Sequence, residues 1–147
     1  MDNRPDLLVI GPDGTPKLVV EVKAKSGTST RWAAQFRRNL VAHGLVPTAS
    51  YFLLASPEQF YLWKPKHDGF DAPPDFVADS RQMLAPWLDR MHTQKGTIGE
   101  SALELLIHAW LSEVMTNPNL EDIPDWLQKS GLHSAIRGAR LRSNASH

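Results

Sequence analysis

The fold is decided by residues 5–23, PDLLVIGPDGTPKLVVEVK. This stretch contains two aliphatic runs, LLVI at 7–10 and LVVEVK at 18–23, with a cluster of turn-forming residues between them. Apolar runs of this kind, separated by Gly, Pro and Asp, are typical of a β-hairpin. We therefore expect two paired antiparallel strands here.

Charged residues interrupt the apolar pattern of this hairpin. Because side chains alternate along a strand, Glu21 and Lys23 project from one face while Val22 enters the core. Asp6 opens the first strand, and pairing it with either Glu21 or Lys23 brings a second carboxylate to the same face. Pairing Asp6 with Val22 instead places it on the opposite face, unless a bulge intervenes. Two of the three registers thus predict a cluster of Asp6, Glu21 and Lys23.

This cluster has the composition of a hydrolytic metal site. Two carboxylates and a backbone carbonyl are hard oxygen ligands of the kind that Mg²⁺ or Mn²⁺ prefers. Such an ion lowers the pKa of a bound water and neutralises charge that grows on a phosphoryl group. Lys23 is suited to orient that water and to stabilise the transition state.

The next elements complete a ββαββ core within residues 1–64. Helical spacing of apolar residues predicts a helix over 31–43, which Gly44 ends. Aromatic and aliphatic runs at 49–55 and 59–64 predict a second hairpin.

A loop rich in Pro, Asp and Gly at 65–74 then leads to a helical half at 75–147. This half is expected to contain a broken helix at 75–91, a regular helix at 99–115 and a final helix or helix pair at 123–142. The regular helix carries an apolar stripe that we expect to pack against the sheet or a second subunit. The stripe consists of Leu103, Ile107, Trp110 and Val114.

The hairpin and the helix after it resemble the PD-(D/E)XK nuclease superfamily. Pro5-Asp6 followed by Glu21-Val22-Lys23 is similar to the bipartite motif of that superfamily, and Gln35 looks like the glutamine that many members carry near the metal site. The resemblance covers roughly residues 4–64. It implies an α/β (α+β) fold of restriction-endonuclease type, with a mixed sheet of about four strands. It assigns catalytic roles to Asp6, Glu21, Lys23 and Gln35, and metal binding to Asp6 and Glu21.

One feature departs from the superfamily pattern. Its core begins with a helix and a strand ahead of the Asp-bearing strand, and that helix often supplies another acid, whereas only four residues precede Pro5 here. We therefore expect the first core helix and strand to be missing, which leaves a sheet edge exposed. Glu100 and Glu104, one helical turn apart, could replace the missing acid. The simpler interpretation is that both are acids that the helix dipole favours at an N-terminus.

The expected activity is that of an Mg²⁺-dependent or Mn²⁺-dependent endonuclease that acts on DNA, with Arg31, Arg37 and Arg38 contacting phosphates. The alternative is a catalytically inactive nuclease-like domain that binds nucleic acid or serves in protein assembly. A homodimer is expected through the helical half or the exposed sheet edge. A regulatory or toxin–antitoxin partner would also fit the small size and the uneven charge.

Composition narrows the remaining classes. The 147 residues suit a single domain, and the absence of Cys excludes disulfides, thiolate metal sites and a cysteine nucleophile. No apolar run approaches the roughly 20 residues of a membrane span, so we expect a cytoplasmic protein with no membrane association. Formal net charge is zero, but residues 1–43 carry seven basic and four acidic residues, whereas 68–125 carry eleven acidic and three basic ones. The last basic residues could return to the basic face or lie on a solvated helix end.

Overall fold

The computed structural model describes residues 5–65, 72–91, 98–117 and 123–143. A six-stranded mixed sheet forms its centre, with the strand order β5-β4-β3-β2-β1-β6. The α+β class is confirmed, although the sheet has six strands instead of the expected four or so. Most of the loop expected at 65–74 lies outside the described residues. The strands are β1 (Leu7–Ile10), β2 (Pro16–Val22), β3 (Tyr51–Ala55), β4 (Gln59–Trp63), β5 (Phe76–Asp79) and β6 (Arg140–Ser143).

The predicted first hairpin is confirmed, and its register is one of the two that bring the charged residues together. β1 and β2 pair antiparallel with Leu7 opposite Val20, and the same register continued by one residue sets Asp6 opposite Glu21. The register shifts at the turn side of the hairpin, where a bulge lies between Val9 and Ile10. Because the bulge lies beyond this pairing, it does not disturb the pair of carboxylates.

The parallel strands β2 and β3 are joined by a crossover connection of the βαβ kind. The crossover contains α1 (Thr30–Ala42), whose N-terminus is capped by the side chain of Ser29. Gly44, with φ of 70°, follows the helix and has the left-handed conformation that favours glycine at a helix end. Helix α1 covers one face of the sheet over a small apolar core, formed by Val19, Ala33, Phe52, Leu54, Tyr61 and Trp63.

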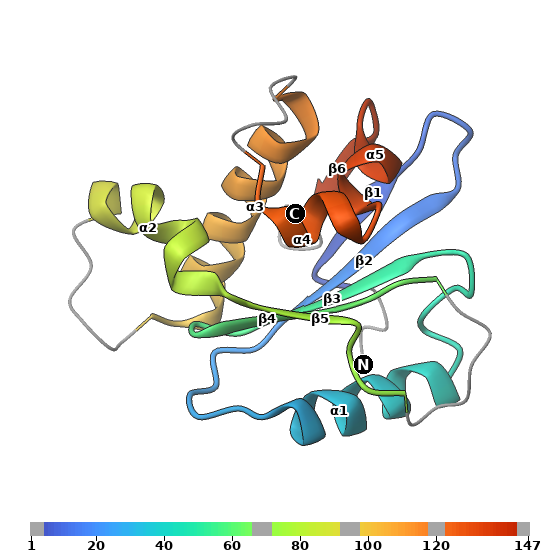
Figure 1. Ribbon diagram of the computed structural model, residues 1–147, viewed down its shortest axis with the longest axis horizontal. Helices are drawn as coiled ribbons and strands as arrows, with labels where there is room; N and C mark the ends of the chain where they lie inside the picture. The colour runs from blue at the N-terminus through green and yellow to red at the C-terminus, as the bar shows by residue number, and fades with distance from the viewer. Residues whose placement is uncertain (1–4, 66–71, 92–97, 118–122, 144–147) are drawn as a thin grey trace.

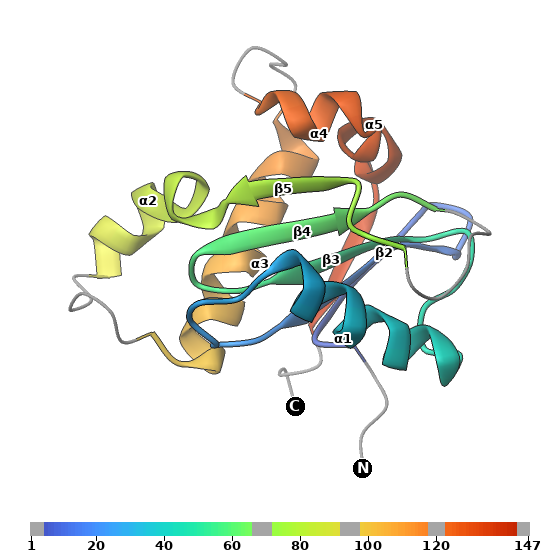
Figure 2. The same ribbon diagram turned by 60° about the horizontal axis from the view of Figure 1, so that its bottom comes forward.

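The other helices cover the opposite face of the sheet (Figure 1). They are α2 (Ser80–Met91), α3 (Glu100–Thr116), α4 (Asp125–Lys129) and α5 (Leu132–Ile136). The predicted stripe of α3 is buried in the larger of the two cores, together with residues of β1 to β4, which confirms that this helix packs against the sheet. Figure 2 shows α1 on one side of the sheet and α3 to α5 on the other.

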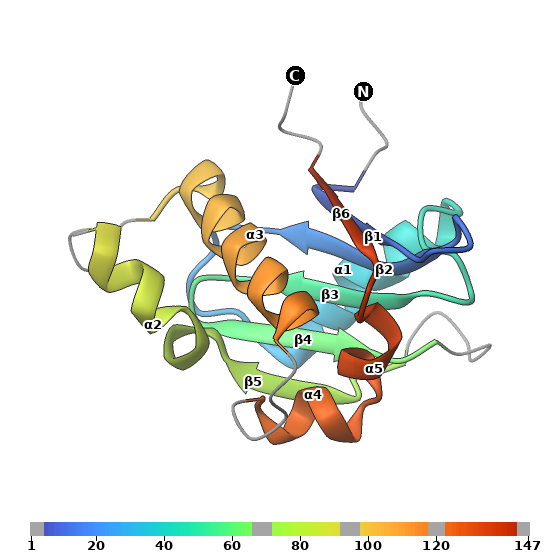
Figure 3. The ribbon, with the colours of Figure 1, turned by 90° about the horizontal axis from the view of Figure 1, so that it is seen from above.

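Two parts of the helical half differ from the expectation. Residues 76–79, expected in a broken helix, form strand β5, and α2 begins directly at Ser80. Residues 140–142, expected at the end of a helix, belong to β6, which pairs antiparallel with β1. The edge of β1 that we expected to be open to a second subunit is therefore covered by this chain (Figure 3).

Within the described ranges, no helix is long and apolar enough to cross a membrane.

Candidate functional site

The candidate site lies where β2 ends and β1 begins. The carboxylate of Asp6 accepts a hydrogen bond at its Oδ2 atom from the N–H of Val22, with a distance of 2.8 Å. Val20 and Val22 enter the larger core, so Glu21 projects from the opposite face, on which α1 lies. The Nζ atom of Lys23 lies 5.5 Å from the ring centroid of Phe36 on α1. The structure thus brings Asp6, Glu21 and Lys23 together, as the hairpin predicted.

Burial and neighbouring charges perturb Glu21. Its side chain is half-buried, and burial together with the negative charge of Asp6 raises the pKa of Glu21 to about 7. The ammonium of Lys23 and a hydrogen bond with the backbone of Asp6 act in the opposite direction, but they do not offset the burial. A carboxylate with such a pKa would be stabilised by a nearby cation, because a cation favours the charged form.

Helix α3 brings two further carboxylates to this cluster. The Oε1 atom of Glu100 lies 3.8 Å from the Nζ atom of Lys23. The pKa of Glu104 is raised, first by burial and then by the charges of Asp6 and Glu100. Glu100 and Glu104 therefore interact electrostatically with the hairpin cluster, which is more than their place in the first turns of a helix requires. The ion pair of Glu100 with Lys23 is an interaction that the helix dipole alone does not require.

The donor set fits a metal ion in part. No group of three or more His, Asp or Glu side chains within the described ranges is arranged to hold a metal ion. Asp6 and Glu21 remain as a pair of carboxylates on one face, and Asp6 uses only its Oδ2 atom in the hydrogen bond to Val22. Mg²⁺ is commonly bound through one or two carboxylates, with waters completing its coordination. The pair therefore fits a magnesium ion of this kind.

The residues of α1 that we expected to support the metal site or to contact phosphate are placed less favourably for these roles than the residues of the hairpin cluster. Gln35 is exposed, and the structure shows no hydrogen bond between it and the cluster. Arg31 and Arg38 are exposed and remain accessible to a ligand. Arg37, also expected to contact phosphate, is only 6% exposed, and its guanidinium lies 5.4 Å from the ring centroid of Trp63, so it is less accessible to a ligand than Arg31 and Arg38. Arginine on the helix face that packs against aromatic strands is buried by their rings.

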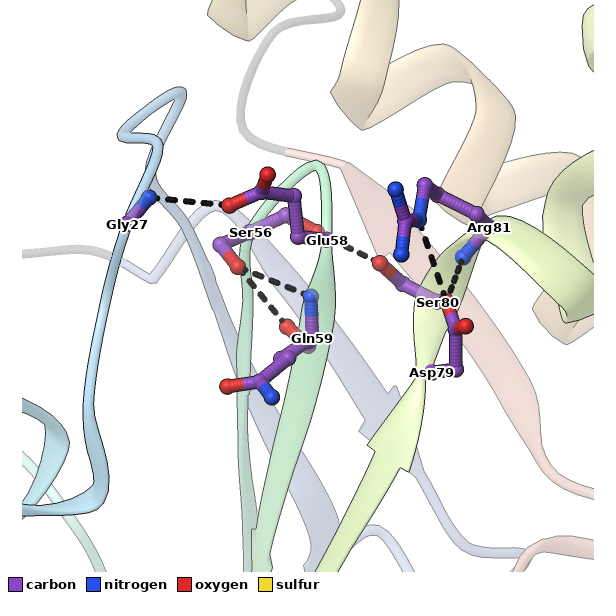
Figure 4. A network of polar contacts seen from close by, with 7 residues as sticks. All are labelled: Gly27, Ser56, Glu58, Gln59, Asp79, Ser80 and Arg81. Carbon is purple, nitrogen blue, oxygen red and sulfur yellow. Dashed lines mark hydrogen bonds and ion pairs between the residues drawn. The ribbon is translucent and has the colours of Figure 1, made fainter.

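A polar network beside the cluster fixes the segment between Lys23 and α1. The N–H of Gly27 donates a hydrogen bond of 2.8 Å to the Oε1 atom of Glu58, which lies in the turn between β3 and β4 (Figure 4). That turn is joined to the start of α2, because the hydroxyl of Ser80 donates to the carbonyl oxygen of Ser56 at 2.9 Å. The sequence indicated only a hairpin turn at 56–58. The anchoring role of Glu58 had no local signal, since its partner lies 31 positions away.

Comparison with models of known protein families, with curated proteins and with solved structures finds no match to the chain.

Proposed function

We propose that the protein is a metal-dependent nuclease of the PD-(D/E)XK type that hydrolyses phosphodiester bonds in DNA. One observation carries the proposal: the register of β1 and β2, continued by one residue, opposes Asp6 to Glu21, with Lys23 directly after the end of β2. The helix and the parallel strand that follow β2 agree with the order that the resemblance implies.

The proposed roles follow from the chemistry of each side chain. Asp6 and Glu21 would hold the Mg²⁺ or Mn²⁺ ion. Such an ion supplies positive charge that activates water and stabilises the phosphoryl transition state. Lys23 would donate hydrogen bonds to the attacking water or to a phosphate oxygen. Its contact with the Phe36 ring limits where the ammonium can lie, which favours a fixed orientation.

The elements that the resemblance requires ahead of Asp6 have counterparts later in the chain. β6 pairs with the outer edge of β1, and α3 carries Glu100 and Glu104 to the cluster. We propose that β6 and α3 act as the first strand and first helix of a nuclease core. Glu104, which is half-buried and whose pKa is raised first by burial and then by the charge of Asp6, is then the acid contributed by that helix.

The test is a cleavage assay with linear, nicked and single-stranded DNA and with RNA, in Mg²⁺, Mn²⁺ or EDTA. The proteins compared are the natural chain, Glu21→Gln, Lys23→Ala and the control Glu113→Gln, whose exposed carboxylate lies further along α3. We expect EDTA and Glu21→Gln to abolish cleavage and Lys23→Ala to reduce it by orders of magnitude, whereas Glu113→Gln cleaves normally. Metal-dependent cleavage that survives both site substitutions would assign the activity to another site or to a contaminant.

One observation favours the alternative of an inactive nuclease-like domain. The described residues offer a pair of carboxylates where three or more would make a stronger metal site, and the ammonium of Lys23 is already engaged with Glu100. Under this alternative the protein binds nucleic acid without cleaving it. Normal DNA binding with no cleavage in either metal would support it and would contradict the nuclease proposal.

A further inference from the structure

Two arginines on β6 project from the same face of the sheet as the candidate site. Leu141 packs against the larger core, on the side of α3. Since side chains alternate along a strand, Arg140 and Arg142 project from the opposite face, and both are exposed. Asp6 and Glu21 share this face, because they alternate with Leu7, Val20 and Val22, which belong to the larger core.

The register of β6 sets one arginine close to the cluster. Arg142 pairs with Leu8 and Arg140 with Ile10. Asp6 lies two residues before Leu8 and therefore occupies the diagonal position relative to Arg142. Diagonal neighbours on adjacent antiparallel strands are separated by about 7–8 Å. The two guanidinium groups thus form a row that begins beside Asp6 and runs away from the cluster.

This row is open to a ligand. The small core beneath α1 takes its buried strand residues from β2, β3 and β4, and β6 contributes none. The side chains of Arg140 and Arg142 form no hydrogen bond or ion pair within the described part of the chain. Their charges are therefore available to an anion from solvent.

The balance of charges at the site indicates which kind of anion Arg140 and Arg142 are suited to bind. The carboxylates of Asp6, Glu21, Glu100 and Glu104 influence one another through their charges, and Lys23 is the cation that acts on them within the described residues, so the cluster by itself repels a polyanion. A nucleic acid whose reacting phosphate enters the cluster needs cationic contacts beside it. Guanidinium groups are well suited to this, because they bind phosphate oxygens through two parallel hydrogen bonds.

We propose that Arg140 and Arg142 bind backbone phosphates of the nucleic acid whose reacting phosphate lies at Asp6 and Glu21. The inference rests on the proposed function. It replaces the buried Arg37 with residues from the far end of the described sequence.

The test is equilibrium binding of a fluorescently labelled DNA duplex in EDTA, where cleavage does not occur, over a series of salt concentrations. We compare the natural chain, Arg140→Gln/Arg142→Gln, and Lys64→Gln/Lys129→Gln. The control pair removes the same charge from exposed lysines, one directly after β4, which is far from β6 in the strand order, and one on α4. Arg140→Lys/Arg142→Lys keeps the charge and serves as a second variant, should the glutamine pair fail to fold.

We expect the arginine pair to weaken binding roughly tenfold or more and to reduce the slope of log Kd against log salt by about 2. The lysine control should leave the slope within about 1 of the natural chain, and the conservative pair should retain it. An unchanged slope in the arginine pair, or an equal loss in the control, would overturn the proposal.

The outcome is separable from that of the nuclease proposal. Glu21→Gln removes a negative charge from the cluster, so it should bind the duplex at least as tightly as the natural chain, even though it does not cleave. If no variant cleaves DNA, the binding comparison still decides whether these arginines contact phosphate.

Discussion

The Nζ atom of Lys23 lies 3.8 Å from the Oε1 atom of Glu100, which joins the end of the first hairpin to the first turn of α3. Both side chains are substantially exposed, at 40% and 56%, so this ion pair adds little to stability. The ion pair is informative because it shows that the helical half lies beside the carboxylates of Asp6 and Glu21. The candidate site is therefore assembled from segments far apart in the sequence.

The raised pKa of Glu21 predicts a pH-dependent gain in stability for Glu21→Gln. The pKa of about 7 in the folded protein exceeds the ordinary value of 4.5, so the folded state binds the proton more tightly than the unfolded state. The contribution of Glu21 to stability is therefore complete below pH 4.5 and is lost as the pH rises to about 7. In EDTA, the free energy of unfolding of Glu21→Gln should exceed that of the natural chain by about 1–3 kcal/mol at pH 8. The difference should be much smaller at pH 4.5. Urea unfolding at both pH values measures this, and Glu113→Gln should follow the natural chain. A variant less stable than the natural chain at pH 8 would contradict the assignment.

Asp6 acts on Glu21 through its charge and on Val22 through its hydrogen bond, and two substitutions separate these effects. Asp6→Asn keeps an oxygen that accepts from the Val22 N–H, whereas Asp6→Ala does not. Both variants should lower the pKa of Glu21, without returning it to 4.5, because burial is the larger cause. Carboxyl ¹³C NMR titration measures that pKa. Only Asp6→Ala should also lose about 1 kcal/mol of unfolding free energy. Equal stability of the two variants would show that the hydrogen bond contributes nothing.

The buried Arg37 predicts a stability effect that a surface arginine lacks. Its guanidinium lies against Trp63, and its stem is buried within the sheet–helix interface. Arg37→Ala should reduce the free energy of unfolding by about 2 kcal/mol through lost packing and cation–π contact. Arg31→Ala, on the exposed side of the same helix, should change it by less than about 0.5 kcal/mol. Denaturant unfolding measures both free energies. No change for Arg37→Ala would show that this side chain lies in solvent and would contradict the prediction.

The turn between α4 and α5 contains Gly131, and its geometry predicts how two glycine substitutions, Gly131→Ala and Gly138→Ala, will differ in their effect on stability. Gly131 has φ of 82°, and a Cβ atom there would lie 2.9 Å from the hydroxyl oxygen of Tyr51. Gly138, with φ of 74°, has open space at its Cβ position. Gly131→Ala should therefore destabilise the protein more than Gly138→Ala, which bears only the roughly 1–2 kcal/mol strain of positive φ.

Removal of the Tyr51 hydroxyl supplies the second test of that turn. Tyr51→Phe loses the 2.7 Å hydrogen bond to the carbonyl oxygen of Ser130, at a cost of about 1 kcal/mol. In this background Gly131→Ala should cost less than in the natural chain, with a coupling of about 0.5 kcal/mol or more. Thermal unfolding of the four proteins gives the coupling, and strict additivity would exclude the steric contact.

The hairpin and the first crossover were predictable because their signals are local. Alternation of apolar and charged residues limits β1 and β2 to a few registers, and the observed one sets Asp6 opposite Glu21. The choice between registers depended on the bulge near Ile10, which the turn sequence does not specify. The burial of Arg37 was missed because charge alone predicts a solvent-exposed residue, whereas the guanidinium lies over the ring of Trp63 on β4.

The two missed strands lacked any local signal. β5 has four residues and runs directly into α2, so no turn separates it from the helix in the sequence. β6 has two arginines in four residues. It is a strand because it pairs with β1, which lies at the other end of the described sequence. Pairing across so many residues cannot be inferred from periodicity, because four residues fit a helix end equally well.

The pairing of β1 with β6 also bears on how the protein is made. During synthesis the first hairpin leaves the ribosome early, but the outer N–H and C=O groups of β1 stay unpaired until residue 143 has emerged. An open strand edge of this kind templates association with other chains. Slow translation of residues 24–139 would therefore favour aggregation of the nascent chain. Glu100 and Glu104 would join Asp6 and Glu21 only once translation has passed α3.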